Sequence, residues 1–278
     1  MTRSVTITVL VENSSSQSDL EAEHGLSLWI EADDLRILFD TGQSAAFFAN
    51  AERLGVPLSD IDALVLSHGH YDHSGGLAFV GPDFQPSRLY LHPSAVLPKY
   101  RQCDRPPHRY IGMPPASAAL IKRMHERVIW TQEPTRISDR VFITGPIPRE
   151  SDFEDVGGPF FQDPECAKPD SLADDQALWI DTPEGLIVCV GCCHAGLVNT
   201  LNYVRRVSGN LTVRAIIGGL HMINANPQRI EHTLEALSQL SPGMVAACHC
   251  TGDRAVQALR AAFGDRISAC HAGVAYCF

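Results

Sequence analysis

The chain has 278 residues, of which 45% are hydrophobic and 19% charged, which is the composition of a globular protein with a sizeable core. Its net charge of −10 disfavours nonspecific binding to nucleic acid, because such binding needs a positive surface. The sequence shows no apolar run of membrane-spanning length and no secretory leader, and its nine cysteines are irregularly spaced. We therefore expect a cytoplasmic protein that acts on a small molecule, without a nucleic-acid or membrane partner.

The first third of the chain predicts strands followed by a helix. Residues 3–11 alternate in polarity like a strand, and residues 26–30 and 35–39 form the two arms of a predicted hairpin. Ser44 is a candidate N-cap for a helix that buries one apolar face and ends at Gly55. A β-branched, apolar run over residues 61–66 then predicts a buried strand.

A cluster of metal-binding residue types follows that strand on a predicted strand-to-helix turn. It consists of His68, His70, Asp72 and His73. Neutral imidazole and carboxylate are ligands that Zn, Fe and Mn accept. One metal does not easily use all four groups, so the pattern favours two adjacent metals. A histidine-rich surface turn is the alternative, and the rarity of this pattern argues against it.

The middle of the chain is dominated by a proline-rich, basic insert at about residues 93–116. It offers five basic side chains: Lys99, Arg101, Arg105, His108 and Arg109. The insert is either a solvated surface loop or a lid whose Arg101, Arg105 and Arg109 bind an anionic substrate. We expect a helix over residues 116–127, strands near 128–130 and 141–143, and a second long loop over 145–173.

The last third repeats one pattern, in which an apolar strand leads to a turn that bears a histidine and then to an amphipathic helix. The strands are predicted at residues 177–180, 186–190, 213–217, 244–247, 267–270 and 274–277. His194, His221 and His249 follow three of them. Strand–helix alternation predicts a layered α/β protein. If these strands run parallel, their carboxyl ends bring the histidines to one edge of the sheet.

These motifs resemble the metallo-β-lactamase superfamily. The signature is His68-x-His70-x-Asp72-His73, and Phe39-Asp40-Thr41-Gly42 resembles the strand-end motif that precedes it. A branch of that family, named for 7,8-dihydropterin-6-methyl-4-(β-D-ribofuranosyl)-aminobenzene-5′-phosphate synthase, is similar in further segments: residues 23–27, 191–196, 218–221 and 249–252. The resemblance implies an αββα sandwich, with two β-sheets face to face and helices on the outer faces. It also implies one domain over residues 1–278, with the insert at about 93–116.

The resemblance also implies a ligand set. His68 and His70 would bind one metal, and Asp72, His73 and His249 the other. The family's bridging aspartate has no counterpart in Gly191-Cys192-Cys193-His194, so we infer that His194 is a ligand.

Several further residues have two interpretations each. Asp174 and Asp175 either add a ligand or are turn carboxylates, and Cys192 either competes for a soft metal or is a buried thiol. Asp40 would fix the tautomer of an imidazole ligand. His24 would border the pocket or hydrogen-bond at the hairpin base.

The function implied is that of a metal-dependent hydrolase, which uses metal-activated water on a small, phosphate-containing metabolite. Asp72 would hold the metal and orient the nucleophile, and His221, if it is not a ligand, would donate to the oxyanion or phosphate. Two Zn ions are expected, with Fe or Mn as alternatives. The alternative functions are a pterin-linked transferase of folate- or methanopterin-like cofactor biosynthesis, an iron-dependent redox enzyme, or a binding protein without turnover. A homo-oligomer is compatible with the sequence.

Overall fold

The computed structural model describes residues 4–15, 17–81 and 84–278, so Arg3 of the first predicted strand lies outside it. Contacts divide the chain into two units. The first unit comprises Met1–Trp130, Pro159–Asp170 and His271–Phe278, and the second comprises Thr131–Gly158 and Ser171–Cys270. The prediction of one domain over the whole chain stays a prediction.

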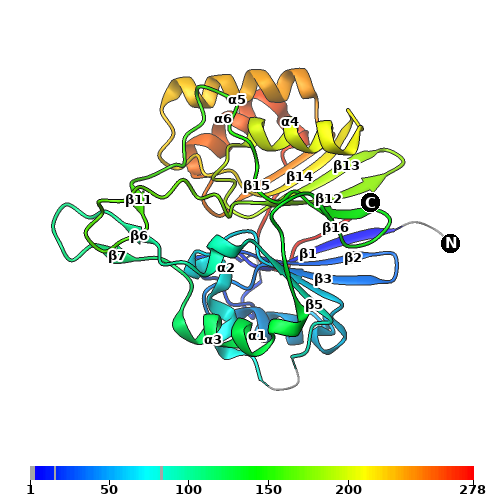
Figure 1. The fold of residues 1–278 in the computed structure, drawn as a ribbon. Helices are drawn as coiled ribbons and strands as arrows, with labels where there is room; N and C mark the ends of the chain where they lie inside the picture. The colour runs from blue at the N-terminus through cyan, green and yellow to red at the C-terminus, as the bar shows by residue number, and fades with distance from the viewer. Residues whose placement is uncertain (1–3, 16, 82–83) are drawn as a thin grey trace. The chain divides into compact units, whose positions relative to one another are not determined.

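The first unit is built on a seven-stranded mixed sheet. In spatial order its strands are β16 (Ala275–Cys277), β1 (Val5–Val11), β2 (Ser27–Ala32), β3 (Leu35–Phe39), β4 (Ala63–Val65), β5 (Arg88–Leu91) and β8 (Val128–Trp130). The predicted hairpin is the antiparallel pair β2–β3, and β3, β4, β5 and β8 run parallel. Helices α1 (Ala46–Arg53) and α3 (Pro115–Arg123) lie on one side of this sheet (Figure 1). Their apolar faces bury residues such as Phe47 and Leu120 against Trp29 and Leu64.

The insert contains regular structure that its proline content hides. Strands β6 (Tyr100–Arg101) and β7 (Arg109–Tyr110) form a short hairpin within it. Strand β11 (Phe160–Phe161), from the second long loop, pairs antiparallel with β6 to complete a three-stranded sheet (Figure 1). The two long loops are therefore joined by backbone hydrogen bonds within the first unit.

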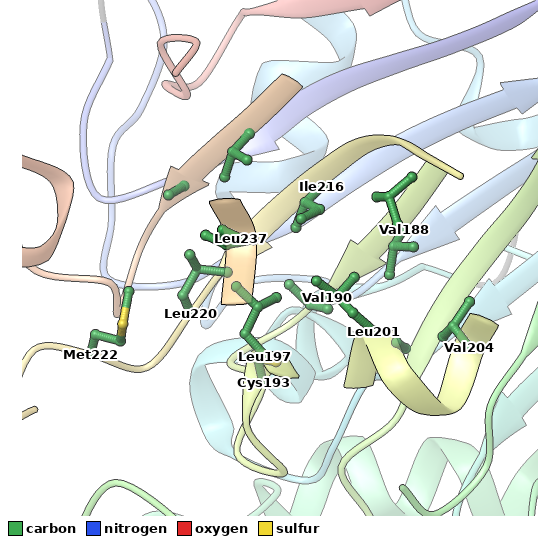
Figure 2. Close-up of a cluster of buried hydrophobic side chains, with 14 of the residues drawn as sticks. Val188, Val190, Cys193, Leu197, Leu201, Val204, Ile216, Leu220, Met222 and Leu237 are labelled. Carbon is green, nitrogen blue, oxygen red and sulfur yellow. The ribbon is translucent and has the colours of Figure 1, made fainter. Parts of the chain in front are cut away.

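The second unit is built on a six-stranded sheet. Its strands in spatial order are β15 (Met244–Cys248), β14 (Val213–Gly219), β13 (Gly185–Val190), β12 (Ala177–Thr182), β10 (Val141–Ile143) and β9 (Thr135–Arg136). Strands β13, β14 and β15 are parallel, as expected. Helices α4 (Leu197–Ser208), α5 (Pro227–Leu240) and α6 (Asp253–Phe263) follow them and cover one face of the sheet (Figure 1). Figure 2 shows the apolar layer between sheet and helices, where Val188 and Ile216 lie near Leu201 and Leu237.

Outside the two long loops, the structure also differs from the expected elements at the following segments. The predicted strand over residues 267–270 is wrong, because that segment makes only an isolated bridge between Ile267 and Val245. The predicted helix over 116–127 ends at Arg123, and a 3₁₀ turn completes it. The strand β9 was not predicted. Among the described residues, no helix has the length and apolar character needed to cross a membrane.

Candidate metal centre

In the first unit, His68 and His70 occupy the turn between β4 and the one-turn helix α2 (Tyr71–Ser74), and Asp72 and His73 lie within that helix. All four side chains are buried. The Nε2 atom of His68 lies 3.0 Å from Nδ1 of His70, and the ring centroids of His68 and His73 are 4.3 Å apart. Oδ2 of Asp72 is 3.7 Å from Nε2 of His73. The turn therefore gathers three imidazoles and a carboxylate away from water.

Asp40 and Ser67 fix the orientation of two of these imidazoles. The Ser67 hydroxyl donates its hydrogen to Oδ2 of Asp40 at 2.6 Å. Because that hydrogen is used, the Oγ atom of Ser67 accepts a hydrogen bond from Nδ1–H of His68 at 2.9 Å. Nδ1 of His73 donates to Oδ2 of Asp40 at 2.7 Å. Both Nε2 atoms are therefore left unprotonated, which is the form in which imidazole binds a metal.

His24 and Tyr71 border the cluster. Nε2 of His24 lies 3.2 Å from Oδ2 of Asp72, and the His24 side chain is 53% exposed, so this residue faces both the cluster and solvent. The Tyr71 hydroxyl accepts a hydrogen bond from Arg109 at 2.9 Å. Burial and the charge of Asp72 raise the pKa of Tyr71, which therefore stays a neutral phenol.

The insert contributes basic side chains beside this motif. Arg101 and Arg109 are exposed and directly opposite each other across the β6–β7 pair, and Arg105 is exposed in the turn between them. Like charges in opposite positions disfavour a strand pair. A fully buried ion pair between Lys99 and Asp170, with 3.1 Å between Nζ and Oδ2, holds the insert to the segment that carries β11.

In the second unit, the strand-end histidines share one edge of the six-stranded sheet. His194, His221 and His249 follow the parallel strands β13, β14 and β15. The rings of His194 and His221 have centroids 4.2 Å apart. His221 and His249 adopt positive φ values of 43° and 53°, which non-glycine residues rarely adopt outside functional turns.

The loop over residues 149–158 packs on these histidines. The carbonyl of Val156 accepts from Nδ1 of His194 at 2.8 Å, which leaves Nε2 of His194 unprotonated. A Cβ atom on Gly157 would lie 1.9 Å from Cδ2 of His221, so only glycine fits there. The Glu154 carboxylate accepts from the backbone N–H groups of Val198 and Asn199 at the start of α4.

The two aspartates before β12 reach the same edge, because β12 runs antiparallel to β13. Oδ2 of Asp175 accepts from the Ala195 backbone at 2.7 Å, while its buried Oδ1 has no hydrogen-bond partner among the described residues. Burial raises the pKa of Asp175 to about 6. Asp174 is buried beside it.

Two cysteines lie among these histidines. A ring nitrogen of His221 and the Sγ atoms of Cys192 and Cys250 all lie within 4.8 Å of one another. Burial opposes ionisation of Cys250, but its contact with Cys192 and the charge of His221 lower the pKa of Cys250 well below its ordinary value.

The first unit thus gathers donors of the kinds that bind divalent metals, and in the second unit Cys192, His221 and Cys250 lie close enough to hold one ion. The first unit brings His68, His70, Asp72 and His73 together, with Asp40 and His24 against them. The second brings His194 and His221 together, with Asp175 behind His194. Sequence reasoning missed Ser67, Val156 and Cys250. A serine before the first histidine was a readable signal for Ser67, but a backbone carbonyl such as that of Val156 leaves no signal in a sequence.

Comparison with known proteins gives a consistent result. The family model of the metallo-β-lactamase superfamily matches residues 20–163. Two proteins of Methanocaldococcus jannaschii are each 30% identical over 91% of this chain: an uncharacterized protein, MJ0448, covered over 93% of its length, and 7,8-dihydropterin-6-methyl-4-(beta-D-ribofuranosyl)-aminobenzene-5′-phosphate synthase, covered over 89%.

The fold is also similar to that of a solved structure. Tm1679, a metal-dependent hydrolase of the beta-lactamase superfamily, superposes with a TM-score of 0.82 at 31% identity, over 98% of each chain. The predicted metallo-β-lactamase fold, with two mixed sheets and helices, is therefore confirmed.

Proposed function

Since this chain belongs to the metallo-β-lactamase superfamily and is a metal-dependent enzyme, we propose that it hydrolyses a small, phosphate-containing metabolite. The observation that carries the proposal is the Asp40–Ser67 network, which leaves the Nε2 atoms of His68 and His73 unprotonated in a buried turn. Unprotonated ring nitrogens of this kind can bind a metal ion. Without a ligand, burying such polar atoms lowers the stability of the fold.

In this proposal the metal ligands are His68, His70, Asp72, His73, His194 and His249, with Asp174 or Asp175 as an additional ligand, and two ions are expected. Zn is the expected metal, with Fe or Mn as alternatives. When bound, such metals lower the pKa of water and polarise a phosphoryl oxygen.

The remaining groups would bind and orient the substrate. Arg101 and Arg109, with Arg105 between them, would attract an anion, which explains two like charges in opposite positions. Asp72 would orient the nucleophile, and His221 would donate a hydrogen bond to the developing charge. A cytoplasmic location belongs to the proposal because all nine cysteines, each among the described residues, are free thiols.

The test combines elemental analysis with phosphodiester hydrolysis. We expect protein purified without added metal to contain about two ions per chain, and chelation to abolish hydrolysis of a chromogenic phosphodiester until metal is restored. His68→Ala and His249→Ala should each lower both metal content and rate, whereas His125→Ala, an exposed histidine, should change neither. Hydrolysis that survives chelation would refute the proposal, and iron instead of zinc would favour the redox alternative.

The second candidate is a pterin-linked synthase, and the 30% identity to the methanogen synthase favours it. Purified enzyme would be incubated with a dihydropterin that carries diphosphate as a leaving group on its 6-methyl carbon, and with a ribofuranosyl-aminobenzene phosphate whose amine displaces the diphosphate. A coupled product, formed faster than any phosphodiester is cleaved, would support the synthase and exclude the hydrolase as the main activity.

A further inference from the structure

Two cysteines and a histidine project from three successive strand-end turns of the second unit. Cys192 follows β13, His221 follows β14 and Cys250 follows β15. Because these strands are parallel and in register, their turns lie at the same edge of the sheet. The three donor atoms lie within 4.8 Å of one another, which is a separation that one metal ion can bridge.

The surrounding backbone leaves room for these side chains. A Cβ atom on Gly219 would lie 2.6 Å from Sγ of Cys250, and one on Gly157 would lie 2.5 Å from Nε2 of His221. The absence of a side chain at each glycine therefore leaves the space that a donor atom occupies. Cys192 and Cys250 are 3% and 6% exposed, so their sulfur atoms are shielded from bulk water.

The neighbouring thiol shows what an ordinary buried cysteine looks like here. Cys193 belongs to the buried apolar cluster drawn in Figure 2, and its sulfur lies 3.4 Å from the Thr200 hydroxyl. Burial raises the pKa of Cys193 well above its ordinary value, so it stays a thiol. Cys192, one residue earlier, faces polar groups instead: its sulfur lies within 4.8 Å of donor atoms of His221 and Cys250, and also of His194 and of His249.

We propose that Cys192, His221 and Cys250 form a binding site for a thiophilic divalent cation such as Zn²⁺ or Cd²⁺. Two thiolates and one imidazole are a soft donor set, and the fourth position of a tetrahedral ion stays open to water or a small anion. Binding requires both thiolates and a neutral imidazole, so loading one cation displaces one proton from Cys192 and one from the Cys250–His221 pair. This donor set shares no residue with the six histidine and aspartate ligands of the proposed catalytic centre.

Occupancy of this site has a consequence that rests on the proposed function. There, His221 donates a hydrogen bond to the charge that develops on the substrate. A cation on its ring nitrogen removes that donor, so a thiophilic ion would inhibit an enzyme whose catalytic centre is already loaded.

The binding test uses Cd²⁺, because cadmium bound to thiolate gives a ligand-to-metal charge-transfer absorption that nitrogen and oxygen ligands do not give. The exposed Cys103 and Cys277 are first replaced by serine to remove surface thiols. In this background we expect a saturable band on titration, together with proton release. Cys192→Ser and Cys250→Ser should each weaken binding by at least about tenfold, while Cys193→Ser, checked for folding by circular dichroism, should leave it unchanged.

His221→Gln tests the third ligand while both thiols remain. Its band should persist with an affinity lowered by about tenfold or more. An absent band, a band that survives in the Cys192→Ser/Cys250→Ser double variant, or a His221→Gln variant with unchanged affinity would overturn the proposal. Hydrolysis that resists chelation, with the band intact, would refute the proposed function and leave this site standing.

Discussion

The carboxylate of Asp40 holds Nδ1 of His73 at 2.7 Å and the hydroxyl of Ser67 at 2.6 Å. Asp40 itself adopts a positive φ of 60° at the end of β3, so the turn is bent in order to present this carboxylate. Two imidazole tautomers depend on one side chain, directly for His73 and through Ser67 for His68.

Replacing Asp40 by Asn should therefore weaken metal binding more than it weakens the fold. Asparagine tolerates the left-handed backbone, but an amide nitrogen in place of Oδ2 cannot accept the hydrogen bond from Nδ1–H of His73. We expect metal affinity to fall by about 10- to 100-fold in a competition titration with a chelator. Asp34→Asn, an exposed aspartate in the same unit, is the control, and equal effects of the two substitutions would contradict the prediction.

The arginine pair on the insert should act on substrate binding. Arg101→Ala and Arg109→Ala each remove one charge-assisted contact, and a contact of about 1.5 kcal/mol corresponds to a KM about tenfold higher for an anionic phosphodiester. The kcat value should change little, because neither residue contacts the metal motif except through Tyr71. Arg88→Ala is the matched control. A neutral ester whose KM rises as much as that of the phosphodiester would argue against an electrostatic role.

Gly157→Ala should disturb His221 by direct contact. The new Cβ would meet Cδ2 of His221 at 1.9 Å, and the φ of +86° adds backbone strain. Gly209→Ala has a similar positive φ of +71° with open space around it, so it isolates the backbone cost of about 1 kcal/mol. We expect Gly157→Ala to lose more free energy of unfolding than this control and to lower kcat. Equal stabilities with normal activity would show that the loop over residues 149–158 adapts freely.

Glu154 should make the stability of the fold depend on pH. Burial raises its pKa above the ordinary 4.5, although the N–H groups of Asn199 and Val198 oppose this shift. Because the folded state then binds the proton more tightly than the unfolded state, this contribution to stability is complete below pH 4.5 and is lost as pH rises through the folded-state pKa.

Glu154→Gln removes that titration and keeps an oxygen that can accept from the start of α4. The free energy of unfolding of the wild type should therefore fall relative to that of Glu154→Gln as pH rises above 4.5, in parallel denaturant titrations. A difference between the two proteins that stays constant with pH, or that changes in the opposite direction, would contradict the shift.

Local patterns explain which features could be predicted from the sequence. His68 and His70 are two residues apart in one motif, so their proximity could be predicted from the sequence. Strand–helix alternation predicts the parallel strands before His194 and His221, so the positions of these two histidines at strand ends could also be predicted. The segment over 267–270 has the apolar pattern of a strand but lacks a neighbouring strand to pair with, and a pattern does not reveal that.

Contacts between distant loops could not be predicted. The β6–β11 pairing joins stretches about sixty residues apart through backbone groups, which any sequence provides. The approach of Cys250 to His221 depends on two turns in which His221 and His249 adopt positive φ values. Because these residues are not glycines, the sequence does not indicate this backbone conformation.

The Lys99–Asp170 pair couples two stretches of chain that the sequence separates. A deletion that shortened the insert past Lys99 would leave a carboxylate with 4% exposure facing no cation, at a cost of about 3–5 kcal/mol. The hairpin is therefore fastened to β11 twice, by backbone hydrogen bonds and by this ion pair, so displacing either segment would break both attachments.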